Sequence, residues 1–172
     1  YDVDVVIDAT GRFLSRDELS AHLDSGAKRV FISRNAKDTI DRYVIPGINE
    51  SSIKSSDKII STTSSTTQVL ALMVKMLDES FGLNRAMMTP VHAYTADQPL
   101  ADAAGVDLRR SRSAVENIIP NTTLAPSIVE SLMPQFSGKL DGIAFNVPVP
   151  NGSCVDLTTE LENTPSVDEA ND

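Results

Sequence analysis

Residues 3–8 read VDVVID, residues 29–33 read RVFIS, and between them the capping-box pattern SRDE begins at Ser15. The two flanking segments are short β-branched runs, which are typical of strands covered on both faces. The segment from Ser15 predicts a helix that has Gly26 as its C-cap. A strand, a helix and a strand at this spacing predict a βαβ unit, and therefore a parallel sheet with a right-handed crossover.

The rest of the chain shows two different sequence patterns, one before and one after Gly82. Two more short strands are expected at 43–45 and 58–61, followed by a helix from Ser65 to about residue 79 that Gly82 ends. This helix has apolar side chains on more than one face, so we expect it to be buried. Beyond Gly82 the pattern predicts long strands joined by loops, with one helix among them: strands at 86–94, 142–149 and 153–161, and a helix at 124–132. The expected fold class is α/β followed by α+β.

Composition excludes several classes of protein. The 172 residues include 15 Lys+Arg and 24 Asp+Glu, which give a net charge of −9. This balance argues against a nucleic-acid or anionic-membrane partner, because binding to phosphate needs clustered basic charge. A single cysteine, Cys154, excludes an internal disulfide and any multi-cysteine metal site, and we expect it to be a small buried side chain. No apolar run approaches a membrane span, so a cytoplasmic protein is expected. The chain starts at Tyr1 and enters a strand at once, which predicts a piece of a longer protein.

The richest hydroxyl cluster is residues 61–67, STTSSTT, directly before the helix that starts at Ser65. A helix N-terminus favours phosphate oxygens or an oxyanion, but the same residues also serve simply as N-caps. His92 lies in an apolar strand, where it is either a core residue or a catalyst. His22 is expected to be a surface residue. The polar segment 97–117 is too long for an ordinary connector and contains three arginines, which could clamp an anion or form an interface: Arg109, Arg110 and Arg112.

Together these segments resemble the glyceraldehyde-3-phosphate dehydrogenase family. The motifs occur in the family's order along nearly the whole chain, and as a set they are highly specific. The closely related erythrose-4-phosphate dehydrogenases share them, and PQF at 134–136 is similar to those proteins. The motifs are VVIDATGRF at 5–13, AKD at 36–38, STTSSTT at 61–67, PVHAYTADQ at 90–98, DLRRSR at 107–112, NIIP at 117–120, GKL at 138–140 and VPVPNGSCVDL at 147–157.

The resemblance implies a cytoplasmic, glycolytic oxidoreductase that uses NAD or NADP and forms a homotetramer, with no metal site. Residues 1–64 would be the C-terminal part of an NAD-binding Rossmann domain. Residues 65–172 would be the N-terminal part of the catalytic domain, a mixed or antiparallel sheet with helices on one face. The family's G-x-G-x-x-G motif lies upstream of this segment. The expected substrates are a phosphorylated small-molecule aldehyde and inorganic phosphate, and neither nucleic acid nor membrane is an expected partner.

The resemblance also assigns roles to individual residues. His92 matches the family's catalytic histidine, which takes the proton from the nucleophile. The residues that match phosphate-binding positions are Ser64, Thr66, Thr95, Asp97, Arg110 and Thr123, and those that match cofactor-pocket positions are Thr10, Gly11 and Ser33.

The active-site pattern departs from the family at several positions. Ser65 stands where the nucleophilic cysteine is expected, Gln68 replaces an asparagine, Asn146 replaces the arginine that grips the substrate phosphate, and Leu124 replaces a glycine. These changes predict impaired or lost activity. Two alternatives remain: a catalytically inactive binding or assembly paralogue, and a weak esterase that uses a Ser65–His92 pair. The sequence shows no acidic partner for His92.

Overall fold

The computed structural model describes residues 2–171 and divides the chain into two compact units, Tyr1–Leu72 and Met73–Asp172. The division falls inside the long helix α2 (Ser65–Phe81). The domain boundary expected between residues 64 and 65 stays a prediction.

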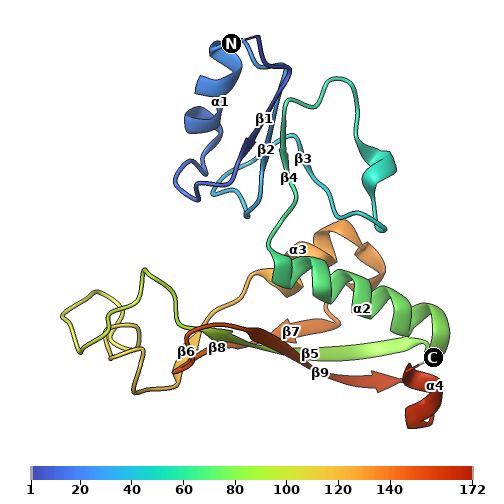
Figure 1. Cartoon of the computed structure of the whole chain (residues 1–172). Helices are drawn as coiled ribbons and strands as arrows, with labels where there is room; N and C mark the ends of the chain where they lie inside the picture. Colours follow the sequence, from blue (N-terminus) through green and yellow to red (C-terminus); the bar gives the residue numbers. More distant parts are fainter. Residues whose placement is uncertain (1, 172) are drawn as a thin grey trace. The chain divides into compact units, whose positions relative to one another are not determined.

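A four-stranded, all-parallel sheet forms the first unit, in the order β1-β2-β4-β3. Its strands are β1 (Val5–Asp8), β2 (Arg29–Ile32), β3 (Arg42–Tyr43) and β4 (Ile59–Ser61), with the short 3₁₀ helix η1 (Glu50–Ser52) before β4. Figure 1 shows α1 (Arg16–Asp24) beside the β1–β2 side of this sheet. The predicted βαβ unit and its parallel sheet are confirmed.

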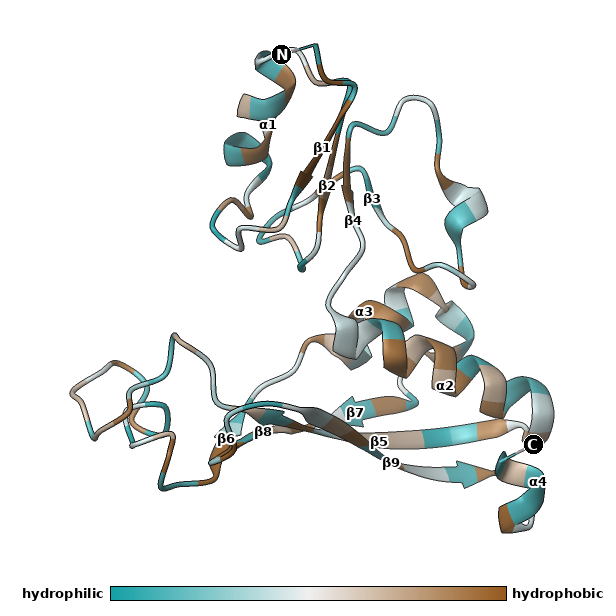
Figure 2. Cartoon of the chain, in the orientation of Figure 1, coloured by the Kyte–Doolittle hydropathy of each residue, from teal (hydrophilic) through white to brown (hydrophobic). Residues whose placement is uncertain are grey.

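Local chemistry explains why α1 forms where it does. The Ser15 hydroxyl accepts a hydrogen bond from the Glu18 backbone, and the Glu18 carboxylate accepts one from the Ser15 backbone at 2.9 Å. Gly26 follows with φ +107°, a left-handed conformation that glycine adopts freely. Leu19 is fully buried against Val30, and apolar colour runs along β1, β2 and β4 in Figure 2. The capping box is therefore confirmed, whereas the C-cap is Ser25 and Gly26 is the left-handed residue that follows it.

One expectation for this sheet is wrong. The β1 strand was expected to be covered on both faces, but Val5 is 45% exposed and Ile7 is 74% exposed. Among the described residues 2–171, β1 lies at the edge of this sheet and pairs with β2 alone, and Asp8 is the one buried residue of this strand. A β-branched run cannot by itself distinguish a strand buried on both faces from one covered on a single face.

A mixed sheet forms the second unit, with the long strand β5 (Leu83–Ala93) near its centre. β5 runs parallel to β7 (Leu140–Gly142) and β8 (Ala144–Val147) and antiparallel to β9 (Ser153–Leu161), and β8 pairs antiparallel with β6 (Ile119–Asn121). In Figure 1, α3 (Ala125–Leu132) and the part of α2 from Met73 onward lie on one face of this sheet. A short 3₁₀ helix η2 (Pro134–Phe136) and the terminal helix α4 (Val167–Asn171) complete the unit. The expected mixed sheet is present.

Several details differ from the sequence predictions. The strand expected at 142–149 is divided into β7 and β8, which are separated at Ile143 but pair with β5 in one continuous register. The helix α2 is only partly buried, since Val69 and Met76 are exposed. Cys154 is exposed on β9 and is not a buried side chain, because its strand packs with one face open to solvent.

Candidate functional site

The predicted cofactor residues follow the carboxyl ends of β1 and β2. The Thr10 hydroxyl donates to Asp8 Oδ1 at 2.7 Å, and the Ser33 backbone N–H donates to the Asp8 carbonyl at 3.4 Å. Gly11 has φ +69°, and a Cβ there would lie 2.8 Å from Arg34 Nη1. The structure therefore brings Thr10, Gly11 and Ser33 to one edge of the parallel sheet, at a turn that needs a glycine.

A half-buried Asp8–His22 pair lies beside this edge, and sequence reasoning missed it. The Asp8 side chain is only 3% exposed, and His22 Nε2 lies 3.1 Å from Asp8 Oδ2. Burial opposes the charged form of the carboxyl, yet the hydrogen bonds from Thr10 and His22 outweigh it and hold the pKa of Asp8 below its ordinary value. The expectation that His22 is merely a surface residue is wrong, because the helix geometry of α1 turns its ring toward the end of β1.

The hydroxyl cluster divides into capping residues and one exposed serine. Ser64 Oγ accepts a hydrogen bond from the Thr67 backbone at 3.2 Å and lies 2.8 Å from Thr67 Oγ1, so Ser64 is the N-cap of α2. Thr66 is the second residue of the helix and half-buried. Ser65 is the first residue of the helix and is exposed. A side chain at that position lies at the positive end of the helix dipole.

The turn before the helix is strained. Thr63 is buried with φ +64°, which is costly for a β-branched residue. Its backbone N–H donates to Ser61 Oγ at 2.9 Å, and Gln68 Nε2 donates to the adjacent Thr62 carbonyl at 2.7 Å. The side chain of Gln68, which stands where the family is expected to have an asparagine, therefore stabilises the turn that precedes Ser65.

His92 lies near the carboxyl end of β5, opposite Ser153 of β9. Its Nδ1 is 3.1 Å from Ser153 Oγ. The partner of this imidazole nitrogen is a hydroxyl and not a carboxylate. Because Ser65 and His92 belong to different compact units, their pairing, and with it the esterase alternative, stays a prediction.

The residues expected around the substrate phosphate form a contiguous cluster. The Thr95 hydroxyl donates to Asp97 Oδ1, and Arg110 Nη2 donates to Asp97 Oδ2 at 2.9 Å. The Thr95 hydroxyl, together with Arg110, holds the pKa of Asp97 below its usual range. Asp107 shapes the same segment, since its carboxylate accepts the Arg109 backbone N–H at 3.0 Å.

A cavity of about 840 Å³ connects Arg110 with the loop before α3. Thr123 lies in its wall, and Thr123 Oγ1 accepts the Ala125 backbone N–H at 3.2 Å. Leu124 has φ −95° and is 62% exposed, so its backbone tolerates a side chain where the family has glycine. The structure thus brings Arg110 and Thr123 together at one cavity.

Asn146 occupies a different environment from a phosphate-gripping arginine. The residue is buried, its Nδ2 donates to the Ala93 carbonyl at 3.1 Å, and its Oδ1 accepts from Asn121 Nδ2 at 3.2 Å. The two polar ends of this amide are therefore hydrogen-bonded to the neighbouring strands β5 and β6. Asn146 is therefore a structural bridge between β5 and β6.

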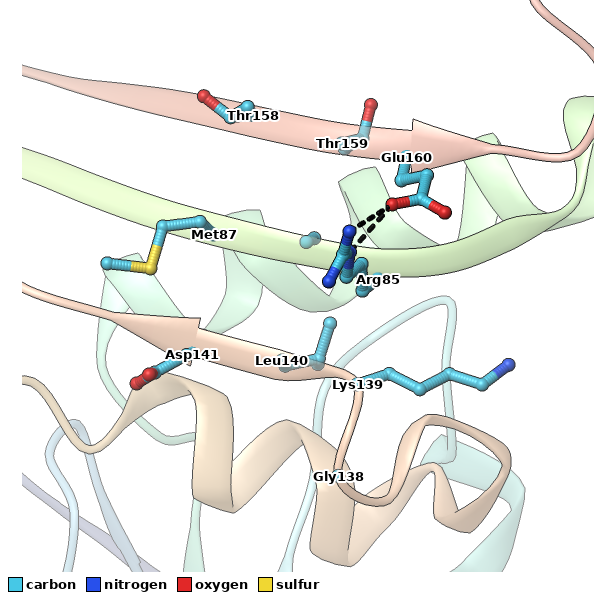
Figure 3. Close-up of a pocket in the computed structure, with 10 residues that line it drawn as sticks. Arg85, Met87, Gly138, Lys139, Leu140, Asp141, Thr158, Thr159 and Glu160 are labelled. Atoms are coloured by element: carbon cyan, nitrogen blue, oxygen red, sulfur yellow. Dashed lines mark hydrogen bonds and ion pairs between the residues drawn. The ribbon is translucent and has the colours of Figure 1, made fainter.

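A second large cavity, of about 730 Å³, contains none of the predicted site residues (Figure 3). It lies over β5, β7 and β9, where Arg85 pairs with Glu160 at 2.6 Å. Both partners of this ion pair are more than half exposed, so it contributes little to binding or stability. We assign no chemistry to this cavity.

Comparison with known proteins finds relatives of this chain along nearly its whole length. Residues 64–172 match the family model described as glyceraldehyde 3-phosphate dehydrogenase, C-terminal domain. The chain is 47% identical over 169 residues to the glyceraldehyde-3-phosphate dehydrogenase of Mycobacterium tuberculosis, and 46% identical over 170 residues to those of Streptomyces coelicolor and Geobacillus stearothermophilus. Each match covers 98% of this chain and 50% of the relative, so the chain spans about half the length of the curated relatives it matches.

The chain thus has a parallel sheet followed by a mixed sheet, and its second part matches a known family model. The chain belongs to the glyceraldehyde 3-phosphate dehydrogenase family. Within residues 2–171, no helix is long and apolar enough to cross a membrane.

Proposed function

We propose that this chain is part of a diverged, cytoplasmic dehydrogenase that retains a nicotinamide-cofactor edge but is impaired in phosphorylating aldehyde oxidation. The observation that carries the proposal is Ser65, the exposed first residue of α2, at the position of the family's nucleophilic cysteine. The substrate class is a phosphorylated small-molecule aldehyde, with inorganic phosphate as the second substrate.

The cofactor edge fits NAD or NADP. The carboxyl ends of β1 and β2 offer the Thr10 and Ser33 hydroxyls beside Gly11, whose Cβ-free, left-handed backbone permits close approach. We take this sheet to be the C-terminal part of a Rossmann domain. When bound, the cofactor supplies hydride-accepting chemistry, and Thr10, Gly11 and Ser33 would line its site.

The nucleophile explains the impairment. A cysteine at a helix N-terminus loses its proton near neutral pH, because the dipole stabilises the thiolate. A serine hydroxyl at Ser65 stays protonated and needs a general base to attack an aldehyde. In our proposal His92 is that base, and it acts on a far weaker acid than a thiol.

Phosphate binding is weakened as well. Asn146 cannot supply the charge-assisted contact that an arginine makes, and both ends of its amide already hold partners. Hydrogen bonds to charged groups are worth about 1.5–3 kcal/mol, so we expect a loss of about 10- to 150-fold in affinity for the substrate phosphate. Arg110 remains as a cation of this site, partly neutralised by Asp97.

The test is phosphate-dependent NAD reduction by the protein encoded by the complete reading frame. It would be assayed with glyceraldehyde 3-phosphate and with erythrose 4-phosphate. Because Cys154 is exposed, the comparison uses a Cys154→Ser background, so that the only thiol in this segment is the one introduced. We expect negligible turnover with Ser65 and partial recovery in Ser65→Cys, with Ser64→Cys as the neighbouring control. Robust turnover by the unaltered protein would refute the proposal.

A second candidate, an assembly module, is favoured by apolar exposure in the 97–117 segment. Leu100 is 65% exposed, Leu108 is 81% exposed, and Val106 is fully exposed. Apolar side chains on a long ordered loop are suited to burial between subunits, as in the homotetramer that the family implies. Light scattering or native mass spectrometry tests this candidate, and a strict monomer at high concentration would contradict it.

A further inference from the structure

One ring nitrogen of His92 contacts the hydroxyl of Ser153, a residue that the proposed function does not use. Nδ1 of His92 lies 3.1 Å from Ser153 Oγ, across an antiparallel strand pair and 61 residues away in sequence. The contact occurs at the last paired position, where β5 approaches its end and β9 begins. The next backbone group, the Ala93 N–H, donates to the Gly152 carbonyl at 3.1 Å and keeps the two strands in register.

The neighbour on the other side of β5 does not compete for the ring. Asn146 of β8 lies opposite His92 in the parallel register. Its amide nitrogen donates to the Ala93 carbonyl and its amide oxygen accepts from Asn121, so both ends of this side chain are occupied. Ser153 is therefore the side chain that orients the His92 imidazole at Nδ1.

The identity of that partner controls the chemistry of the opposite nitrogen. In a neutral imidazole one nitrogen carries a proton and the other carries a lone pair, and the hydrogen bond made by one nitrogen determines the state of the other. Ser153 is exposed, so its hydroxyl can donate a hydrogen bond to solvent while its oxygen accepts one from the imidazole ring. With Nδ1–H donating to Ser153 Oγ, the lone pair lies at Nε2, which can then receive a proton.

We propose that Ser153 is a positioning residue that fixes His92 as its Nδ1–H tautomer and leaves Nε2 as the proton acceptor. The hydrogen bond itself needs no assumption about activity. Its consequence for catalysis rests on the proposed function, in which His92 takes the proton of the nucleophile at position 65.

Nitrogen-15 NMR of the histidine side chains tests this proposal directly. A His92→Gln variant lacks the His92 signals and thereby assigns them in the spectra of the full-length protein. Spectra are recorded near pH 9, well above the pKa of an unperturbed imidazole, where the ring is neutral. Ser153→Thr and Ser153→Val form a matched pair, because both are β-branched residues suited to a strand and they differ by one hydroxyl.

We expect the Nδ1–H tautomer to dominate in the parent and in Ser153→Thr, and the Nε2–H tautomer to dominate in Ser153→Val. A parent that is mainly Nε2–H, or a Ser153→Val variant that keeps the parent's tautomer, would overturn the proposal. If Ser153→Val does not fold, Ser153→Ala gives the same comparison. A Ser65→Cys protein without turnover would count against the proposed function and leave the tautomer result intact, so the two failures are distinguishable.

Discussion

Replacing Asp8 is the sharpest test of how the first unit is held together. Its carboxylate accepts the Thr10 backbone N–H at 2.9 Å and the Thr10 hydroxyl at 2.7 Å, and it lies 3.1 Å from His22 Nε2. A hydrogen bond to a charged group contributes about 1.5–3 kcal/mol. Because Thr10 and His22 are partly open to solvent, their donors recover water contacts when the carboxylate is removed. We therefore expect Asp8→Ala to lower the free energy of unfolding of the first unit by about 2–4 kcal/mol in total. Asp8→Asn, which keeps the shape and one acceptor oxygen, should lower it by about 1–2 kcal/mol.

The pH dependence gives the same prediction an independent check. The folded-state pKa of Asp8 lies below the value of about 3.9 for an aspartate in an unfolded chain. The contribution of its charge is therefore present above about pH 3.9 and is lost as the pH falls through the folded-state pKa. The stability difference between the parent and Asp8→Asn should shrink as the pH falls through the folded-state pKa of Asp8.

Native-state amide hydrogen exchange is the suitable assay, because two compact units need not unfold together. The Val30 amide, which donates to the Lys58 carbonyl at 2.8 Å, reports on the first unit alone. Asp24→Asn, an exposed carboxyl at the end of α1, is the control and should change stability by no more than about 0.5 kcal/mol. Equal protection of Val30 in the parent and in Asp8→Asn at pH 7, or a difference between them that does not shrink in acid, would refute this account of the pair.

Three further outcomes follow from single contacts. Ser15→Ala removes the N-cap of α1 and should cost about 1 kcal/mol, measured as faster amide exchange in the first unit. Gly142→Ala places a Cβ 2.9 Å from the Met88 carbonyl oxygen, so the strands must shift. We expect the free energy of unfolding, measured with urea, to fall by about 1–3 kcal/mol. An unchanged free energy of unfolding would contradict this packing. Cys154 should react with a thiol reagent in the native protein, and Cys154→Ser should change stability by less than about 0.5 kcal/mol.

The parts of the fold that could be predicted are those encoded by neighbouring residues. The Ser15 capping box spans four positions, and Gly26 and Gly82 terminate helices through their own backbone freedom. The edge position of β1 could not be predicted, because exposure of Val5 and Ile7 depends on which elements cover the sheet. Such coverage is a tertiary property that a β-branched run does not carry.

The contacts of the candidate site also differ in how far apart their residues lie in the sequence. The Thr95–Asp97 contact is local, and Asp97 pairs with Arg110 only 13 residues away. The His92–Ser153 and Asn146–Ala93 contacts join residues 61 and 53 positions apart. They arise from strand register, and a shift of one residue would turn these side chains to the opposite face of the sheet.

The departures from the family are of two physical kinds, and this difference bears on how the site diverged. Ser65 is an exposed first helical residue, so exchanging its hydroxyl for a thiol disturbs nothing around it. Asn146 is buried, and its amide bridges the Ala93 carbonyl and Asn121. An arginine at that position could donate to the Ala93 carbonyl, but it carries no acceptor for the Asn121 amide N–H, which would have to turn or bind water. On the proposed function, restoring the nucleophile therefore changes one exposed side chain. Restoring the phosphate contact also requires the polar partners of position 146 to find new hydrogen bonds.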